Sequence, residues 1–397
     1  MYLLAILLLF LITVTFVTWH LWCLTPGGWV PKLAVSLLFL LWMVAAFASM
    51  ALRSRASLST ITALYEIGHP WMIAYLYLLV AFLLLDIGVL VRLIPKEWLS
   101  DNGYLMAGIF AVVAAILVSG GIHYKHKYRE ELTIQTEKSL PRPLTVVLAS
   151  DLHLGYSNRR EELSRWIDLI NDEKPDLVLF GGDIVDIQLR PLVEGNYAAE
   201  FACIGVPIYT VLGNHEYIGS EPESEKFFTD AGITLLRDSV AHFEGLTLIG
   251  RDDRSNRSRK PLSDLLDGAD GFTILLDHQP YHLEEAEEAG VDFQFSGHTH
   301  RGQVWPVSWV TDALFEKSWG HYQRGNTRYY ISSGLGIWGP KIRVGTRSEY
   351  LVLHLVSGKP ETLHVPEDDM VDINETLRRQ HHYPCDLPHQ PDQEIIW

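Results

Sequence analysis

The 397-residue chain has a formal net charge of −16 at pH 7. Residues 1–123 hold five Lys/Arg and four Asp/Glu, so their net charge is +1 and the remaining residues carry −17. This acidic balance argues against a nucleic-acid-binding surface, which requires a basic patch, and it is compatible with bound cations. The three cysteines form no CxxC pair, so a thiolate zinc site is not indicated.

The first third of the chain contains four long apolar runs, Leu3–Leu24, Leu33–Leu52, Trp71–Val91 and Tyr104–Ile122. Each run is close to the roughly 20 residues that cross a bilayer as a helix. The first run lacks a preceding basic segment and is longer than the apolar part of a signal peptide. We therefore expect residues 1–123 to be a transmembrane region of about four helices, in a multi-pass protein of the cell membrane.

Four spans would place both ends of the chain on the same side of the membrane. The segments that would then be inside hold Arg53, Arg55, Lys125, Lys127 and Arg129, whereas those outside hold Lys32, Arg92 and Lys96. The positive-inside rule therefore favours a cytoplasmic catalytic portion. Asp86 lies within the third run, where a carboxylate indicates either a functional group or a structural pair. We prefer pairing with Arg92 or with a neighbouring helix.

Residues 124–142 form a charged segment that we interpret as a linker. From residue 143 onward, short runs rich in β-branched residues alternate with helical patterns. The predicted strands are 143–150, 176–182, 206–214, 246–251, 272–278, 291–298 and 328–334, and the predicted helices are 158–173, 221–231 and 282–289. Residues 359–397 are polar and contain several prolines, so we expect a mostly irregular tail whose histidines face solvent.

Side chains of metal-ligand type follow five of the predicted strands. They are Asp151 and His153, Asp183 and Asp186, Asn214 with His215 and Glu216, Asp277 and His278, and His298 and His300. The carboxyl ends of strands are where α/β sheets assemble a site. If these segments stay extended, residues i and i+2 aim the same way. For residues 295–303 alone, a surface turn is the alternative, but five such endings are hard to explain as turns.

These side chains offer carboxylate and amide oxygens and imidazole nitrogens, without a thiolate. Such a set suits Mn, Fe, Zn or Mg rather than a closed structural zinc site. Seven ligands are too many for one tetrahedral ion. They suit two divalent metal ions about 3.5–4 Å apart that share a bridging carboxylate, as in two-metal phosphatases.

The blocks DLH, GDIVD, GNHE, H and GHTH, in this order, resemble the signature of the calcineurin-like metallophosphoesterases. The resemblance extends from about Val146 to His300. GNHEY, FSGHTHRGQ and SSGLGIWGPKIRVG are similar to the membrane-associated bacterial branch of that family. The resemblance implies an α/β fold for residues 143–358, a two-sheet β-sandwich flanked by helices in four αββα layers.

The resemblance also implies roles for individual residues. The first metal would be bound by Asp151, His153 and His300, the second by Asn214, His278 and His298, and Asp183 would bridge them. His215 would be the catalytic residue that protonates the leaving group or stabilises its charge. Gly297 would permit close approach of the chain. Asp277 is an alternative to His278 as the inward-facing group.

Three further positions have open roles. Asp186 is expected to orient a ligand or to cap the following segment. Glu216 stands where many relatives have aspartate, so its role is open. Arg301 is either a guanidinium that binds a substrate phosphate or a solvated turn arginine. The basic stretch 251–260 likewise either receives an anionic head group or is a flexible charged loop.

The function implied is that of a membrane-bound, dinuclear-metal-dependent hydrolase. It would cleave phosphodiester or pyrophosphate bonds by attack of a metal-held hydroxide. Four spans exceed what an anchor needs, so we expect the lipid bilayer as a partner and a lipid-linked phosphate ester or diphosphate as the substrate. The resemblance implies a UDP-diacylglucosamine-type intermediate as one candidate. A general phosphodiesterase is the other candidate, and no nucleic-acid partner is expected. A membrane sensor or scaffold that binds a phosphorylated ligand without turnover is the alternative class, and a transporter, supported only by Asp86, is the last.

Overall fold

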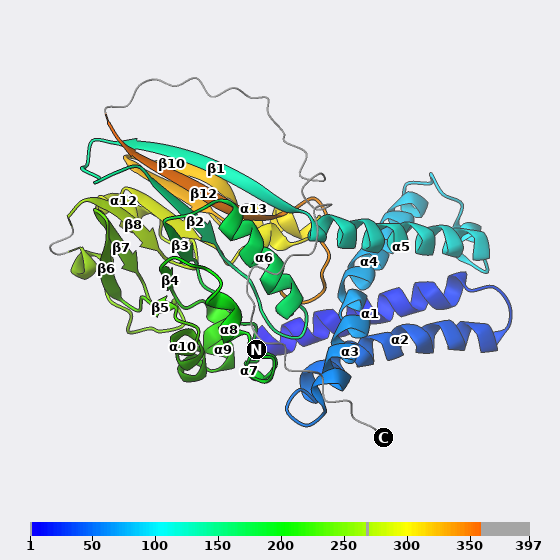
Figure 1. Cartoon of the computed structure of the whole chain (residues 1–397). Coiled ribbons are helices and arrows are strands. Elements are labelled where there is room, and N and C mark those ends of the chain that lie inside the picture. Colours follow the sequence, from blue (N-terminus) through cyan, green and yellow to red (C-terminus); the bar gives the residue numbers. More distant parts are fainter. Residues whose placement is uncertain (1, 267–269, 359–397) are drawn as a thin grey trace.

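The computed structural model describes residues 2–266 and 270–358 (Figure 1). The predicted tail, residues 359–397, lies outside the described residues. The described chain has an N-terminal helical bundle and a larger α/β part that contains two sheets (Figure 1).

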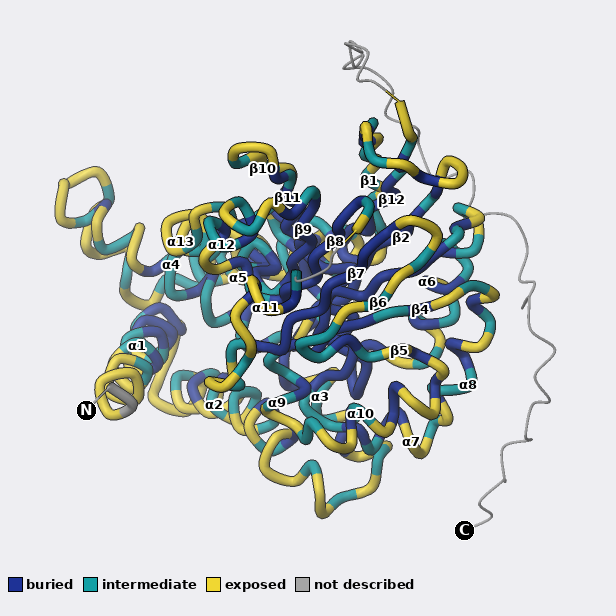
Figure 2. The backbone as a smooth tube through the Cα atoms, turned by 90° about the vertical axis from the view of Figure 1, so that its left-hand side faces the viewer, coloured by how far each residue is buried: buried dark blue, intermediate teal, exposed yellow. Residues whose placement is uncertain are grey.

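Each apolar run forms one long helix of the bundle. These helices are α1 (Tyr2–Leu24), α2 (Trp29–Ala51), α4 (Pro70–Leu90) and α5 (Gly103–Lys125), with the shorter α3 (Leu58–Gly68) and η1 (Lys96–Leu99) between them. All four are long and apolar enough to cross a membrane. Much of their surface is exposed, as Figure 2 shows for α1 and α2, and it consists of leucine, isoleucine and valine side chains. A membrane is the solvent in which such an apolar exterior is stable.

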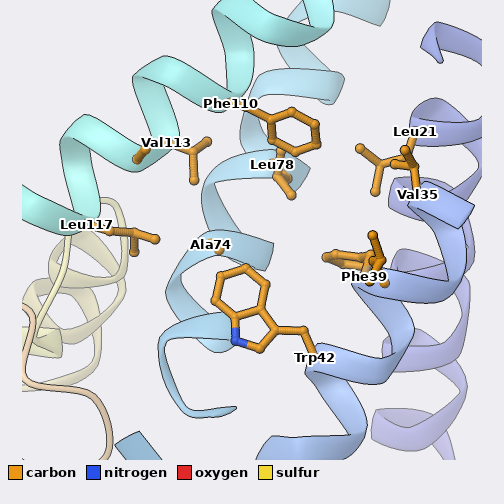
Figure 3. Close-up of a pocket in the computed structure, with 11 residues that line it drawn as sticks. Leu21, Val35, Phe39, Trp42, Ala74, Leu78, Phe110, Val113 and Leu117 are labelled. Carbon is orange, nitrogen blue, oxygen red and sulfur yellow. The ribbon is translucent and has the colours of Figure 1, made fainter. Parts of the chain in front are cut away.

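A polar pair and an apolar cavity lie between the bundle helices. His20 Nε2 of α1 lies 3.1 Å from Asp86 Oδ1 of α4, so Asp86 pairs with a neighbouring helix. Figure 3 shows the cavity, which has a volume of about 530 Å³. Its lining comes from α1, α2, α4 and α5 and includes Phe39, Trp42 and Phe110.

The α/β part contains two six-stranded sheets. The first has the order β1-β12-β2-β3-β4-β5, with β1 Lys127–Thr136, β12 Ser348–Ser357, β2 Leu144–Ala149, β3 Leu177–Phe180, β4 Ile208–Thr210 and β5 Thr234–Leu235. The second has the order β10-β11-β9-β8-β7-β6, with β10 Gly320–Arg324, β11 Thr327–Ile331, β9 Phe293–Ser296, β8 Phe272–Leu276, β7 Leu246–Gly250 and β6 Ser239–Phe243. All seven predicted strands are present. Strands β2, β3, β4 and β5 are parallel, as are β7, β8, β9 and β11.

The two sheets pack face to face, and helices cover both outer faces. Alternate residues of the central strands, such as Val146 and Leu148 of β2, join an apolar cluster with Ile274 and Phe295 of the opposite sheet. The outer face of the first sheet packs against α6 (Arg160–Asp172), α8 (Ala198–Phe201) and α10 (Glu221–Asp230), and that of the second packs against α11 (Leu262–Leu265) and α12 (Glu284–Glu288). The expected four-layer αββα sandwich is therefore confirmed, and its strands are the most buried part of the chain (Figure 2).

The segment 124–142 is not a linker along its whole length. Residues 127–136 form β1, which pairs in parallel with β12 over its full ten residues. Since α5 ends at Lys125 and β1 begins at Lys127, the last apolar helix leads directly into the sheet. The first sheet already includes β1, which precedes residue 143. The domain boundary at residue 143 stays a proposal.

The helical bundle contacts the loops at one edge of the sandwich. Tyr77 of α4 donates a hydrogen bond to the carbonyl of Trp305 at 2.6 Å, and the N–H of Arg343 donates to the carbonyl of Gly120 in α5 at 3.0 Å. Val304 and Ile342 belong to the same apolar cluster as the bundle helices. These loops include the chain just after His300, so the bundle lies against the edge where the candidate ligands are found.

Candidate metal centre

The seven predicted ligands converge from five loops. Asp151 and His153 follow β2, Asp183 follows β3, Asn214 opens α9 (Asn214–Gly219) after β4, His278 follows β8, and His298 and His300 follow β9, with His300 opening η2 (His300–Gly302). Six of the seven, all except Asn214, lie in two clusters, and within each cluster the ligand atoms are within 4.8 Å of one another. The parallel strands of each sheet bring these loops to one edge.

The first cluster consists of Asp151, His153 and His300. The Nε2 atoms of the two imidazoles face each other at 3.0 Å, and His300 Nε2 lies 3.3 Å from Asp151 Oδ1. Two ring nitrogens at this distance can share one proton or can bind one cation between them. The arrangement of the three side chains therefore suits a cation.

The second cluster consists of Asp183, His278 and His298. Asp183 Oδ2 lies 3.2 Å from His278 Nε2, and Asn214 Oδ1 lies 2.7 Å from His298 Nδ1. The same Asp183 oxygen is 3.7 Å from His153 Nε2, which belongs to the first cluster. Asp183 thus stands between the two clusters.

Tight backbone turns, not extended segments, aim the ligands. Asp151, His153, Asp183, His298 and His300 all have positive φ angles, between 45° and 71°. The expectation that i and i+2 converge by staying extended is therefore wrong. Left-handed backbone is unfavourable for residues with a Cβ and persists only where the surroundings hold it, which is common at functional sites.

Backbone N–H groups hold the two carboxylates in place. The N–H of His298 donates to Asp151 Oδ1 at 3.0 Å, and the N–H of His215 donates to Asp183 Oδ1 at 2.9 Å. Gly297 makes the first contact possible, because a Cβ there would lie 2.3 Å from Asp151 Oδ2. The close approach expected at Gly297 is present.

Glu216 fixes the loop that carries Asp183. Its buried carboxylate accepts hydrogen bonds from the backbone N–H groups of Asp183, Val185 and Gly213, at 3.1, 2.9 and 2.8 Å. Burial, followed by the nearby Asp183 carboxylate, raises the pKa of Glu216 to about 7. Glu216, whose role the sequence leaves open, thus connects the loops after β3 and β4 through hydrogen bonds to their backbone.

His215 lies beside the clusters and is oriented by Asp186. Its Nδ1 donates to Asp186 Oδ1 at 3.0 Å, and its ring centroid is 4.4 Å from that of His153. Asp186 also lies 3.7 Å from His153 Nδ1. Asp186 thus orients His215, and its role toward the proposed ligand His153 stays a proposal.

Mutual attraction between carboxylates and imidazoles keeps the acids ionised despite their burial. Burial opposes ionisation of Asp183, but His278 and then His215 hold the pKa of its carboxyl well below its ordinary value. Asp151 behaves in the same way, with His300 as the main opposing influence on its pKa. Burial, with the neighbouring His278, lowers the pKa of His298 to about 4. His298 is therefore neutral at pH 7, as a metal ligand must be.

The donor set fits a divalent metal. His278 Nδ1 donates to the carbonyl of Gly181 at 2.7 Å, so in the neutral ring Nε2 is the atom that can bind a cation, and it faces Asp183 Oδ2 at 3.2 Å. That Nε2 is buried without a hydrogen-bond partner. A buried polar atom without a partner is costly, and a cation between His278 and Asp183 would satisfy it. The His–backbone contact is the kind of support that metal-binding imidazoles have.

The structure distinguishes between Asp277 and His278 as the group that faces the metal centre. The buried carboxylate of Asp277 faces away from the ligands, 3.3 Å from Arg251 Nη1 and 3.1 Å from Arg259 Nη1, so His278 is the inward-facing group.

Arg301 stacks its guanidinium over Trp319, 4.5 Å from the ring centroid. Arg301 is half-buried, and both of its interpretations, binding of a substrate phosphate and a solvated turn arginine, stay open.

Two buried residues that sequence reasoning missed support the ligands. Asn158 Nδ2 donates to the carbonyls of Leu152 and His153, at 2.9 and 3.2 Å. Arg343 donates through Nη1 to the carbonyl of His300 at 2.9 Å. Asn158 acts within its own loop, five and six residues from the carbonyls it binds, whereas Arg343 belongs to the motif at residues 332–345 and reaches a carbonyl 43 residues away. In both cases the bonds are to backbone, which the identity of the side chain alone does not indicate.

Comparisons with known proteins agree with this geometry. A family described as calcineurin-like phosphoesterase matches residues 144–302. An uncharacterized metallophosphoesterase of Aquifex aeolicus is 31% identical over 245 residues, which are 58% of this chain and 92% of that protein. An uncharacterized metallophosphoesterase of Helicobacter pylori is 30% identical over 240 residues, which are 57% of this chain, and the chain spans 63% of that relative's length.

A third relative has the same combination of parts. A "transmembrane protein with metallophosphoesterase domain" of Danio rerio is 27% identical over 305 residues, 69% of this chain and 70% of that protein. The chain belongs to the calcineurin-like phosphoesterase family. The four long apolar helices make it a membrane protein of that family.

Proposed function

We propose that this protein is a membrane-bound, dinuclear-metal-dependent phosphoesterase that hydrolyses phosphodiester or pyrophosphate bonds. The observation that supports this most is the position of Asp183, whose Oδ2 lies 3.2 Å from His278 of one cluster and 3.7 Å from His153 of the other. A single carboxylate between two ligand clusters is what two ions sharing a bridge require.

The proposed ligands follow the two clusters. Asp151, His153 and His300 would hold the first ion, Asn214, His278 and His298 would hold the second, and Asp183 would bridge them. Two bound divalent ions would supply Lewis acidity, would lower the pKa of a nucleophilic water and would neutralise charge on the phosphate. The ion could be Mn, Fe, Zn or Mg, since the mixed oxygen and nitrogen set suits each of them.

His215 is the proposed general acid. Asp186 Oδ1 accepts the hydrogen bond from His215 Nδ1, which orients the ring and leaves Nε2 as the atom that would donate to the leaving-group oxygen. The side chain of His215 is only 12% exposed. The Asp186 carboxylate orients this imidazole as an acidic partner orients catalytic histidines in other hydrolases.

The first test is hydrolysis of bis(4-nitrophenyl) phosphate by the full-length protein in detergent. The protein is treated with a chelator, and Mn, Fe, Zn or Mg is then restored separately. We expect turnover only with a restored ion, and none in Asp183→Asn. Stoichiometric metal binding without turnover of any phosphate ester would instead favour a sensor or scaffold.

Four membrane crossings and a cytoplasmic metallophosphoesterase domain are also proposals. They are supported by four helices of sufficient length and by the basic residues of the expected inside segments. A lipid-linked phosphate ester or diphosphate, for instance of UDP-diacylglucosamine type, is the proposed substrate class. Protease protection of the α/β part in sealed, right-side-out vesicles would test the orientation.

A further inference from the structure

Helix α13 (Val307–Leu314) presents an apolar face to the outside of the α/β part. Trp309, Val310 and Leu314 are 65%, 56% and 70% exposed. At about 100° per residue, these side chains and Ala313 share one side of the helix, while Ser308, Thr311 and Asp312 lie on the other. We call Trp305, Trp309, Val310 and Leu314 the α13 face, since the rings of Trp305 and Trp309 are in contact, 5.4 Å between centroids.

The beginning of this face is joined to the helical bundle. The carbonyl of Trp305 accepts a hydrogen bond from Tyr77, which lies seven residues inside α4 from Pro70. Seven residues correspond to about 10 Å along a helix. Val307 packs against the apolar cluster of the bundle. The start of α13 therefore lies close to α4.

The end of α13 lies at the metal centre. Phe315 follows Leu314 directly, and its ring centroid is 6.2 Å from that of His298 and 4.8 Å from that of Tyr281. The guanidinium of Arg254 stands over Tyr281, 4.8 Å from the ring centroid. The apolar face thus runs from the bundle to a cationic and aromatic rim beside a proposed metal ligand.

We propose that the α13 face lies in the membrane interface and that lipid-anchored phosphate esters reach the metal centre along it. The inference rests on the proposed function and names its substrate class. Exposed tryptophans beside transmembrane helices are typical of the headgroup region, and a short amphipathic helix buries such a face in that region. Continuity with the bundle favours the bilayer over a soluble partner or a second copy. Arg254 is placed to receive an anionic group of the substrate.

The test compares two esters that share the 4-nitrophenolate leaving group. One is the soluble bis(4-nitrophenyl) phosphate, and the other is a diacylglycerol 4-nitrophenyl phosphate in phosphatidylcholine liposomes that contain the full-length protein. The variant is Trp309→Ser/Leu314→Ser, whose changes lie on an exposed surface. The control is Val240→Ser, because Val240 is also exposed but belongs to β6, at the end of the sandwich far from the bundle (Figure 1).

We expect kcat/KM for the lipid ester to fall at least about tenfold in the double variant, because two large apolar contacts with lipid are lost. The soluble ester should be hydrolysed within about twofold of the parent rate, since surface changes of this kind leave the site intact. The control should match the parent on both esters. An equal loss on both esters, or no loss on either, would overturn the proposal.

A second measurement does not depend on activity. Trp309→Phe removes one of the 12 tryptophans, so the difference in fluorescence between parent and variant reports on Trp309. Brominated phosphatidylcholine should quench this difference signal, and an unquenched signal would overturn the proposal. Quenching combined with hydrolysis of neither ester by the parent would support the membrane contact and would count against the proposed phosphoesterase function alone.

Discussion

The hydroxyl of Tyr124, at the end of α5, donates a hydrogen bond of 2.6 Å to the side-chain oxygen of Asn158. The amide nitrogen of the same Asn158 donates to the carbonyls of Leu152 and His153. Both Tyr124 and Asn158 are buried. One side chain therefore connects the last apolar helix to the backbone of a proposed metal ligand.

Tyr124→Phe should weaken both folding and metal binding. The change leaves the Asn158 oxygen buried without a donor, which costs about 1–3 kcal/mol. We expect a lower melting temperature in detergent and a weaker affinity for the ion, measured by titration after chelation. Tyr104→Phe is the control, because Tyr104 lies at the other end of α5 and is 95% exposed. Equal metal affinity in Tyr124→Phe and the control would show that the hydrogen bond does not support the site.

Replacement of His215 and of His278 should separate turnover from metal binding. His215→Ala removes the proposed proton donor, so we expect kcat to fall by about 10²–10⁴-fold while the metal content is retained. His278→Ala removes a proposed ligand whose Nε2 faces Asp183 at 3.2 Å, so metal content and activity should fall together. Metal analysis and steady-state kinetics on the same preparations provide both values. Full activity in His215→Ala would remove this residue from the reaction.

The sandwich could be predicted because its central strands are apolar on both faces. Five of the six residues of β2 are buried, with Thr145 as the exception, and all four residues of β3 are buried. The sequence of strand β1, KYREELTIQT, is charged and therefore predicts a linker and not a strand. It lies at the edge of the sheet beside β12, where charged side chains reach solvent and discourage pairing with other chains. Local sequence alone does not distinguish such a strand from a charged connector.

The ligand types could be predicted from their positions after strands, but their geometry could not. Asp151 and His300 take left-handed backbone conformations that their own chemistry does not favour. The supporting groups come from elsewhere, for example the N–H of His298 on Asp151 and Arg343 on the carbonyl of His300. Contacts between distant segments thus determine how the ligands point.

Gly213→Ala should disrupt the bridge without unfolding the protein. A Cβ at this position would lie 2.1 Å from Asp183 Oδ1 and 2.7 Å from the backbone nitrogen of Asp183, so both the carboxylate and the loop that carries it have to move. We expect loss of bound metal and of activity in a protein that still folds, with a somewhat lower melting temperature than the parent protein without metal. Gly205→Ala is the matched control, because a Cβ there meets no atom within 4 Å. A normal metal content in Gly213→Ala would count against the bridging role of Asp183.

Glu216→Gln should destabilise the loops that carry Asp183 and Asn214. The glutamate accepts three backbone N–H groups through two oxygens, whereas glutamine places an NH₂ group where one of those oxygens stood. Two donors would then face each other in a fully buried site, at a cost of about 1–3 kcal/mol. We expect a lower melting temperature and a reduced metal affinity, measured by thermal denaturation and by metal titration. Glu223→Gln, in the first turn of α10, should leave both unchanged, and a Glu216→Gln protein as stable as this control would show that Glu216 does not brace the loops.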